Sequence, residues 1–171
     1  MLGPANQEIL MRARADLRLG VPIVLAGKEN AAIIAPIEVL NESRLDQLKV
    51  IDKKSFILIT TRRAQTLKCP IYDENFVRIA LGQFLKIASL KAIADPFLDL
   101  RNPLKGPFNI IRGKTLKLEN EALLLLKSAQ LLPAAIISKV ENGENYANRH
   151  KLTYLTTEQI REIAISPGDI A

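Results

Sequence analysis

The run LLPAAIISKVENGENYANRHKLTYLTTEQIREI, residues 131–163, carries the strongest structural signal in the chain. Pro133 is expected to end a preceding helix, because a proline ring and its missing N–H interrupt helical hydrogen bonding. Short apolar, β-branched runs bounded by turn residues are typical of strands. The pattern predicts a strand at 134–140, a turn at 141–145, a short helical turn at 146–150 and a strand at 152–156.

A helix start follows this last strand. Thr156 and Gln159 have the spacing of an S/T-x-x-E/Q capping box, in which each side chain accepts a hydrogen bond from the backbone of the other residue. Leu155 and Ile160 flank the box with the spacing of a hydrophobic staple. We therefore expect a helix at 157–166.

The rest of the chain also alternates between helical and strand-like patterns. Residues 75–95 mix both periods, so only a helix-like end at 88–95 is assigned there, and the Pro- and Gly-rich residues 95–109 are expected to form a loop. Strands that alternate with helices through short connections indicate one layered α/β domain. Further helices are predicted at 6–19, 42–51, 61–67 and 120–132, and further strands at 21–27, 31–40 and 55–61.

Composition agrees with a globular domain: the 171 residues are 48% hydrophobic and 25% charged. No apolar run approaches the ~18 residues that a membrane-spanning helix requires. Cys69 is the only cysteine, which rules out an internal disulfide and fits a reducing compartment. We therefore expect a cytoplasmic protein with no membrane partner.

The net charge of +6 favours anionic partners in general. Nucleic acid is not expected among them, because the basic residues are scattered among acids and the chain has five Phe, three Tyr and no Trp. A nucleic-acid platform normally combines basic and aromatic side chains on one surface.

Common catalytic motifs are missing from the sequence. There is no GxGxxG, GxSxG, CxxC or HExxH pattern, and Gly20 and Gly27 are too far apart for a phosphate-binding P-loop. One histidine and one cysteine do not make a zinc site of the usual kind. His150, the only histidine, is predicted near the end of a short helix, where a cation complements the helix dipole. We interpret it as a scaffold residue.

Taken together, residues 131–163 resemble the end of 3,4-dihydroxy-2-butanone 4-phosphate synthase. That family has a helix ending in Pro, an A-G-V-L-C-E-L strand, an F-A-x-K-H-x-L segment and a V-T-I-E-D-L-I helix start, which match Pro133, 134–140, 146–152 and 155–160. Upstream, residues 20–50 share the layout of the family's first hairpin and helix. The resemblance implies a single layered α/β sandwich with a mixed sheet over residues 1–166, and a tail or linker start at 167–171.

The resemblance also implies an activity. The family enzyme acts as a homodimer and uses magnesium to convert ribulose 5-phosphate into a four-carbon precursor of riboflavin and formate. Its site consists of an acidic D-R-E-N-E-G-D loop, two histidines and a later glutamate. The metal polarises the oxygens of the sugar during enolisation and rearrangement.

This chain departs from the family at those positions. The acidic loop aligns with residues 26–33, where a family metal ligand meets Lys28 or Glu29. The histidines fall near 105–106 and Leu118, and the later glutamate falls on Lys139. At an effective dielectric of about 20, two charges ~4 Å apart interact by about 4 kcal/mol per unit charge product. An ammonium group in place of a carboxylate therefore turns an attraction for the metal into a repulsion of similar size.

We therefore expect a catalytically inactive synthase-like domain that binds no cofactor. Its expected role is structural: dimerisation, or support of a fused or associated GTP cyclohydrolase II domain, of which it would form the N-terminal part.

Two alternatives remain open. In the first, a rewired synthase uses Glu29, Glu119, Glu121 or Glu141 and still requires magnesium. In the second, the chain binds a sugar phosphate without metal, because four cations occupy the segment where the family grips phosphate. Those cations are Arg101, Lys105, Arg112 and Lys114.

Overall fold

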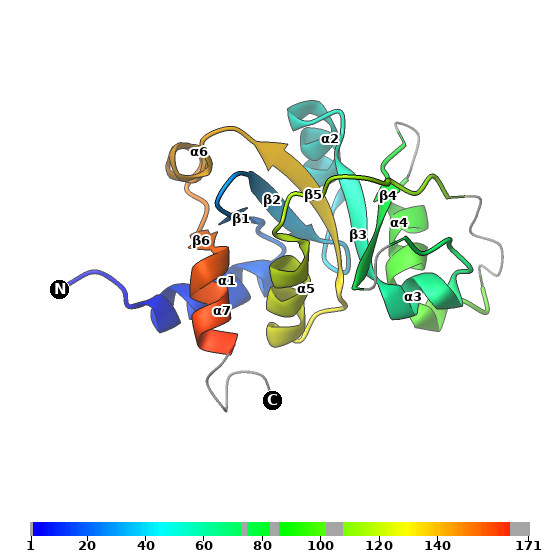
Figure 1. Cartoon of the computed structure of the whole chain (residues 1–171), viewed down its shortest axis with the longest axis horizontal. Coiled ribbons are helices and arrows are strands. Elements are labelled where there is room, and N and C mark those ends of the chain that lie inside the picture. Colours follow the sequence, from blue (N-terminus) through cyan, green and yellow to red (C-terminus); the bar gives the residue numbers. More distant parts are fainter. Residues whose placement is uncertain (1, 73–74, 83–85, 102–107, 165–171) are drawn as a thin grey trace.

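The computed structural model describes residues 2–72, 75–82, 86–101 and 108–164 (Figure 1). Its strands form a sheet in the order β4-β3-β5-β2-β1-β6. The β1–β6 pair is parallel and every other neighbouring pair is antiparallel, so the sheet is mixed, as expected. The strands are β1 Ile23–Ala26, β2 Ala31–Pro36, β3 Phe56–Thr60, β4 Phe76–Ala80, β5 Ala134–Val140 and β6 Tyr154–Thr156.

Helices cover both faces of the sheet, because successive strand residues point to opposite sides and both sides are apolar. Helices α1, α5 and α7 supply one core, and α2, α3, α4 and α6 supply the other. Figure 1 shows α1, α5 and α7 gathered together. The helices are α1 Asn6–Leu19, α2 Glu42–Ile51, α3 Thr61–Thr66, α4 Ile87–Ala94, the short 3-10 helix η1 Pro96–Leu98, α5 Glu119–Ser128, α6 Gly143–His150 and α7 Thr157–Ala164.

The capping box ahead of α7 is confirmed. The Gln159 backbone N–H donates to Thr156 Oγ1 over 3.2 Å, and the Thr156 N–H donates to Gln159 Oε1 over 2.9 Å. Leu155 and Ile160 are both buried in the same core. This reciprocal pair fixes where β6 ends and α7 begins.

Several predicted boundaries change. The predicted helix at 120–132 ends at Ser128, because Gln130 adopts a left-handed backbone with φ of 61°. The strand predicted at 31–40 ends at Pro36, and α6 begins at Gly143 within the expected turn. The ambiguous residues 75–95 contain β4 and α4. The end of the predicted helix at 157–166 and the expected tail at 167–171 lie outside the described residues.

Among the described residues, no helix is both long and apolar enough to cross a membrane.

Candidate functional site

Three segments that we aligned with the synthase family's site lie at one end of the sheet: the β1–β2 turn, the end of β5 and the residues before α5. Residues 105–106, aligned with a family histidine, lie outside the described residues. Lys139 of β5 pairs in register with Ala32 of β2, next to the β1–β2 turn. Asn30 in that turn donates to the Leu116 carbonyl over 3.4 Å. Glu29 lies 3.7 Å from Lys117, although both side chains are exposed and this pair contributes little. The turn, the end of β5 and the segment before α5 are therefore neighbours.

Glu119 holds the segment before α5 in place. Its side chain is buried, with Oε2 accepting from the Leu116 N–H over 3.0 Å and Oε1 from the Leu118 N–H over 3.1 Å. Both carboxylate oxygens are thus used by the backbone. Leu118, near which the sequence comparison places a histidine of the family, is itself fully buried in the core.

We expect Glu119→Ala to lower the free energy of unfolding by about 1–3 kcal/mol, because two backbone N–H groups would lose their acceptor. Urea denaturation followed by circular dichroism measures the change. The neighbouring Asn120→Ala is the control, since Asn120 is exposed and should change stability by less than about 0.5 kcal/mol. Equal effects of the two substitutions would contradict the anchoring role of Glu119.

A cavity of about 510 Å³ lies beside Lys139, between the sheet and the segment before α5. Its charged lining comes from the loop after α2, from β4 and from β5: Asp52, Lys53, Lys54, Arg78 and Lys139. Its other lining residues are Ser55, Phe56, Ala80, Leu81, Ile111 and Leu116. Pockets of this volume with mostly apolar walls and a few polar groups are typical of small-molecule sites.

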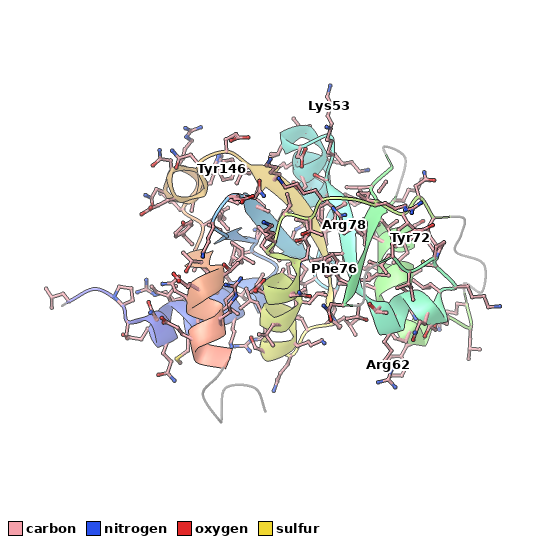
Figure 2. The ribbon with its side chains drawn as sticks, in the orientation of Figure 1. Lys53, Arg62, Tyr72, Phe76, Arg78 and Tyr146 are labelled. Atoms are coloured by element: carbon pink, nitrogen blue, oxygen red, sulfur yellow. The ribbon has the colours of Figure 1, made fainter. Side chains whose placement is uncertain are left out.

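Arg78 is the buried cation of the cavity wall. Its guanidinium donates to the carbonyls of Gly113 and Lys114 over 3.0 and 3.1 Å, and it lies 5.8 Å from the centre of the Phe56 ring. Figure 2 shows Arg78 and Phe76 on the same side of β4, whereas Lys53 extends outward from the loop after α2. Arg78 therefore forms a wall of the cavity, and Lys53 belongs to its rim.

Asp52 is the one acidic residue among the described cavity-lining residues, and its oxygens are engaged by the backbone. Oδ2 accepts from the Lys139 N–H over 3.0 Å, and Oδ1 accepts from the Lys54 N–H over 2.9 Å. These bonds tie the loop after α2 to β5. Four cationic side chains and one carboxylate leave the lining with a net positive charge.

Each of the four glutamates considered for a rewired synthase has its own partner or its own place in the fold. Glu29 faces Lys117 and Glu119 caps the backbone. Glu121 accepts from Arg161 Nε over 2.8 Å, and Glu141 is exposed directly after β5. Within the described ranges, no group of three or more His, Cys, Asp or Glu residues could hold a metal ion.

The four cations expected to grip phosphate are not seen to form one site. Arg101 follows η1 and is exposed, Arg112 lies with its guanidinium carbon 4.0 Å from the centre of the Tyr72 ring, and Lys114 is exposed. Lys105 lies outside the described residues. The cavity is instead lined by Lys53, Lys54, Arg78 and Lys139, none of which we had predicted as an anion ligand.

The surroundings of His150 and Cys69 favour a structural role over a catalytic one for both residues. His150 ends α6, as expected, and its ring centre lies 4.3 Å from that of Tyr146. Burial raises the pKa of the Cys69 thiol above its ordinary value, and the charge of Arg63 opposes this shift. A raised pKa keeps the thiol protonated and disfavours a nucleophilic role.

No protein-family model and no curated protein matches this sequence. Solved structures do match. A 3,4-dihydroxy-2-butanone 4-phosphate synthase from Candida albicans is 15% identical with a TM-score of 0.68, covering 92% of this chain and 97% of that one. A synthase of the same name in complex with two magnesium ions is 14% identical with a TM-score of 0.63, covering 95% and 96%.

A two-domain 3,4-dihydroxy-2-butanone 4-phosphate synthase from A. baumannii is 14% identical with a TM-score of 0.66. The alignment covers 88% of this chain and 56% of that chain, so the present chain spans a little over half of the two-domain enzyme. These similarities show that the chain has the 3,4-dihydroxy-2-butanone 4-phosphate synthase fold, the mixed α/β sandwich expected from its sequence.

Proposed function

We propose that this chain is a catalytically inactive domain with the synthase fold, associated with riboflavin biosynthesis. The observation that supports it best is Lys139, which occupies the position of a family glutamate beside the β1–β2 turn. Its ammonium group repels a divalent cation, and the fully buried Leu118 offers no ligand where the family has a histidine.

The proposed role is structural: dimerisation, and support of a fused or associated GTP cyclohydrolase II domain. The match to one part of a two-domain synthase supports a domain that works beside another. We place the protein in the cytoplasm and assign it no cofactor. Magnesium would matter only for a surviving synthase reaction.

The test is formate release from ribulose 5-phosphate by the purified chain in the presence of Mg²⁺, with an active synthase assayed in parallel. We expect release at the rate of the enzyme-free blank, because the family's later glutamate aligns with Lys139 and one of its histidines falls near Leu118. Turnover that requires Mg²⁺ and disappears in Glu29→Gln would overturn the proposal in favour of the rewired synthase.

A second candidate function, metal-free binding of an organic phosphate, is favoured by the cationic lining of the cavity. Arg78 and Lys139 line the cavity and would contact the phosphate there. Phosphate binding at Arg101, Lys105, Arg112 and Lys114 stays a proposal. Binding of this kind is compatible with an inactive domain.

A further inference from the structure

We propose that the cavity beside Lys139 binds, without a metal, a phosphate monoester whose body is a planar apolar ring system. This inference rests on the second candidate function, the metal-free binding of an organic phosphate, and names the class of ligand that the cavity would take. Three properties of the described lining point to it: apolar walls, an excess of positive charge and a buried arginine with unused donors.

The walls provide room and contact surface for an apolar body. Leu81, Ile111 and Leu116 are partly buried and lie around the cavity with the nearly buried Phe56. A volume of about 510 Å³ accommodates a fused ring system together with its phosphate. Burying such a body stabilises the complex by roughly 25 cal/mol for each Å² of apolar surface removed from water.

The charge of the lining selects an anion. Lys54 and Lys139 contribute exposed ammonium groups, and Arg78 contributes a buried guanidinium. In the described part of the chain no carboxylate forms an ion pair with any of these three groups. The Asp52 oxygens accept hydrogen bonds from the backbone at the same edge. A doubly charged phosphate therefore meets a lining with more positive than negative charge.

Arg78 has donors to spare. A guanidinium carries five N–H groups, and two hydrogen bonds hold this one to Gly113 and Lys114. No fully buried side-chain nitrogen among the described residues lacks a partner. Arg78 Nε, for which no hydrogen bond is seen within the described ranges, is therefore not fully enclosed, and Arg78 is one of the residues that line the cavity.

The preference for a flat body rests on Phe56. Its ring lines the cavity, and the Arg78 guanidinium carbon lies 5.8 Å from the ring centre. Aromatic rings pair with other π-systems in edge-to-face or offset-stacked arrangements. A flat aromatic ligand would therefore gain a contact with Phe56 that a flexible alkyl chain of equal area would not.

The experiment is isothermal titration calorimetry of the whole chain with 1-naphthyl phosphate, in EDTA and low salt. We expect it to bind at least about tenfold more tightly than 1-naphthol, inorganic phosphate or dodecyl phosphate. If 1-naphthol bound as tightly as 1-naphthyl phosphate, the anion would play no role. If inorganic phosphate bound as tightly as 1-naphthyl phosphate, the ring would play no role, and either result would refute the proposal. Tighter binding of dodecyl phosphate would indicate a lipid-like ligand and overturn the proposal, as would no binding at millimolar 1-naphthyl phosphate.

Charge reversal locates the site. Lys139→Glu is expected to weaken 1-naphthyl phosphate binding at least about tenfold, and Lys54→Glu provides a second variant should the first fail to fold. The matched control is Lys127→Glu, because Lys127 is exposed on α5 and does not line the cavity. Equal weakening by the control would place binding elsewhere and refute the proposal. Formate release is measured in a separate assay. Synthase activity would refute the proposed inactive domain, whereas absence of 1-naphthyl phosphate binding would refute only this ligand site.

Discussion

Replacing Arg63 by alanine is expected to lower the free energy of unfolding by about 3 kcal/mol. Arg63 is 8% exposed, and its guanidinium donates to both carboxylate oxygens of Asp99 over 2.8 and 2.9 Å. It also donates to the carbonyls of Ala92 and Ile93, near the end of α4, over 3.2 and 2.8 Å. One side chain thus joins α3, α4 and the residues after η1.

The size of this loss of stability follows from the groups that would lose their hydrogen-bond donor, the Asp99 carboxylate and two backbone carbonyls. Breaking a buried ion pair by removing one partner is destabilising by about 3–5 kcal/mol, and the partial exposure of Asp99 puts this pair at the lower end. Two carbonyl groups also lose a donor. Lysine at position 63 should restore only part of the loss, since an ammonium group does not reproduce the two parallel bonds.

Urea denaturation of Arg63→Ala and of a matched control measures the change in the free energy of unfolding. Arg62→Ala is the control, because it removes the same side chain from an exposed neighbouring position, and Figure 2 shows Arg62 extending away from the fold. The control should change stability by less than about 0.5 kcal/mol. A similar loss in both variants would mean that Arg63 does not act through its buried bonds.

Replacing Gly143 by valine is expected to destabilise the fold by a similar amount, about 3 kcal/mol. A Cβ atom at this position would lie 2.7 Å from the Cβ of Ala31 and 3.2 Å from Cγ1 of Val24. Both neighbours belong to paired strands, so they cannot move aside without disturbing the sheet. Valine adds two methyl groups to an already overlapping carbon.

Thermal unfolding of Gly143→Val and Gly82→Val tests this packing. A Cβ at Gly82 meets nothing within 4 Å, so the control should unfold close to the temperature of the parent chain. Gly143→Ala should show a smaller loss in the same direction. A stable Gly143→Val would contradict the close approach of α6 to β1 and β2.

The sequence predicted elements best where local chemistry decides them. The capping box at Thr156 and Gln159 specifies the start of α7 through local hydrogen bonds, and β5 was predicted with its correct ends. Strand β4 was ambiguous because Phe76–Ala80 is nearly buried on both faces and contains a charged residue, Arg78. Neither strand alternation nor a continuous apolar run was present to identify it.

The candidate site was predicted only in part. The resemblance singled out Lys139 and Leu118, and the structure places Lys139 at the cavity. It did not indicate Arg78 or Lys54, because the lining comes from segments that meet only through the sheet order β4-β3-β5. Phosphate binding by Arg101, Lys105, Arg112 and Lys114 was inferred from closeness in sequence and stays a prediction, since Lys105 lies outside the described residues.

The sheet order also constrains how the chain can fold during its synthesis. Strand β5 lies between β2 and β3, yet it is made after both of them. At translation rates of about 5–20 residues per second, the roughly 100 residues between β2 and β5 delay the joining strand by about 5–20 s. Until then the β1–β2 hairpin and the antiparallel β3–β4 pair each expose an edge that can pair with another chain. The emerging polypeptide is therefore exposed to incorrect strand pairing until β5 has left the ribosome.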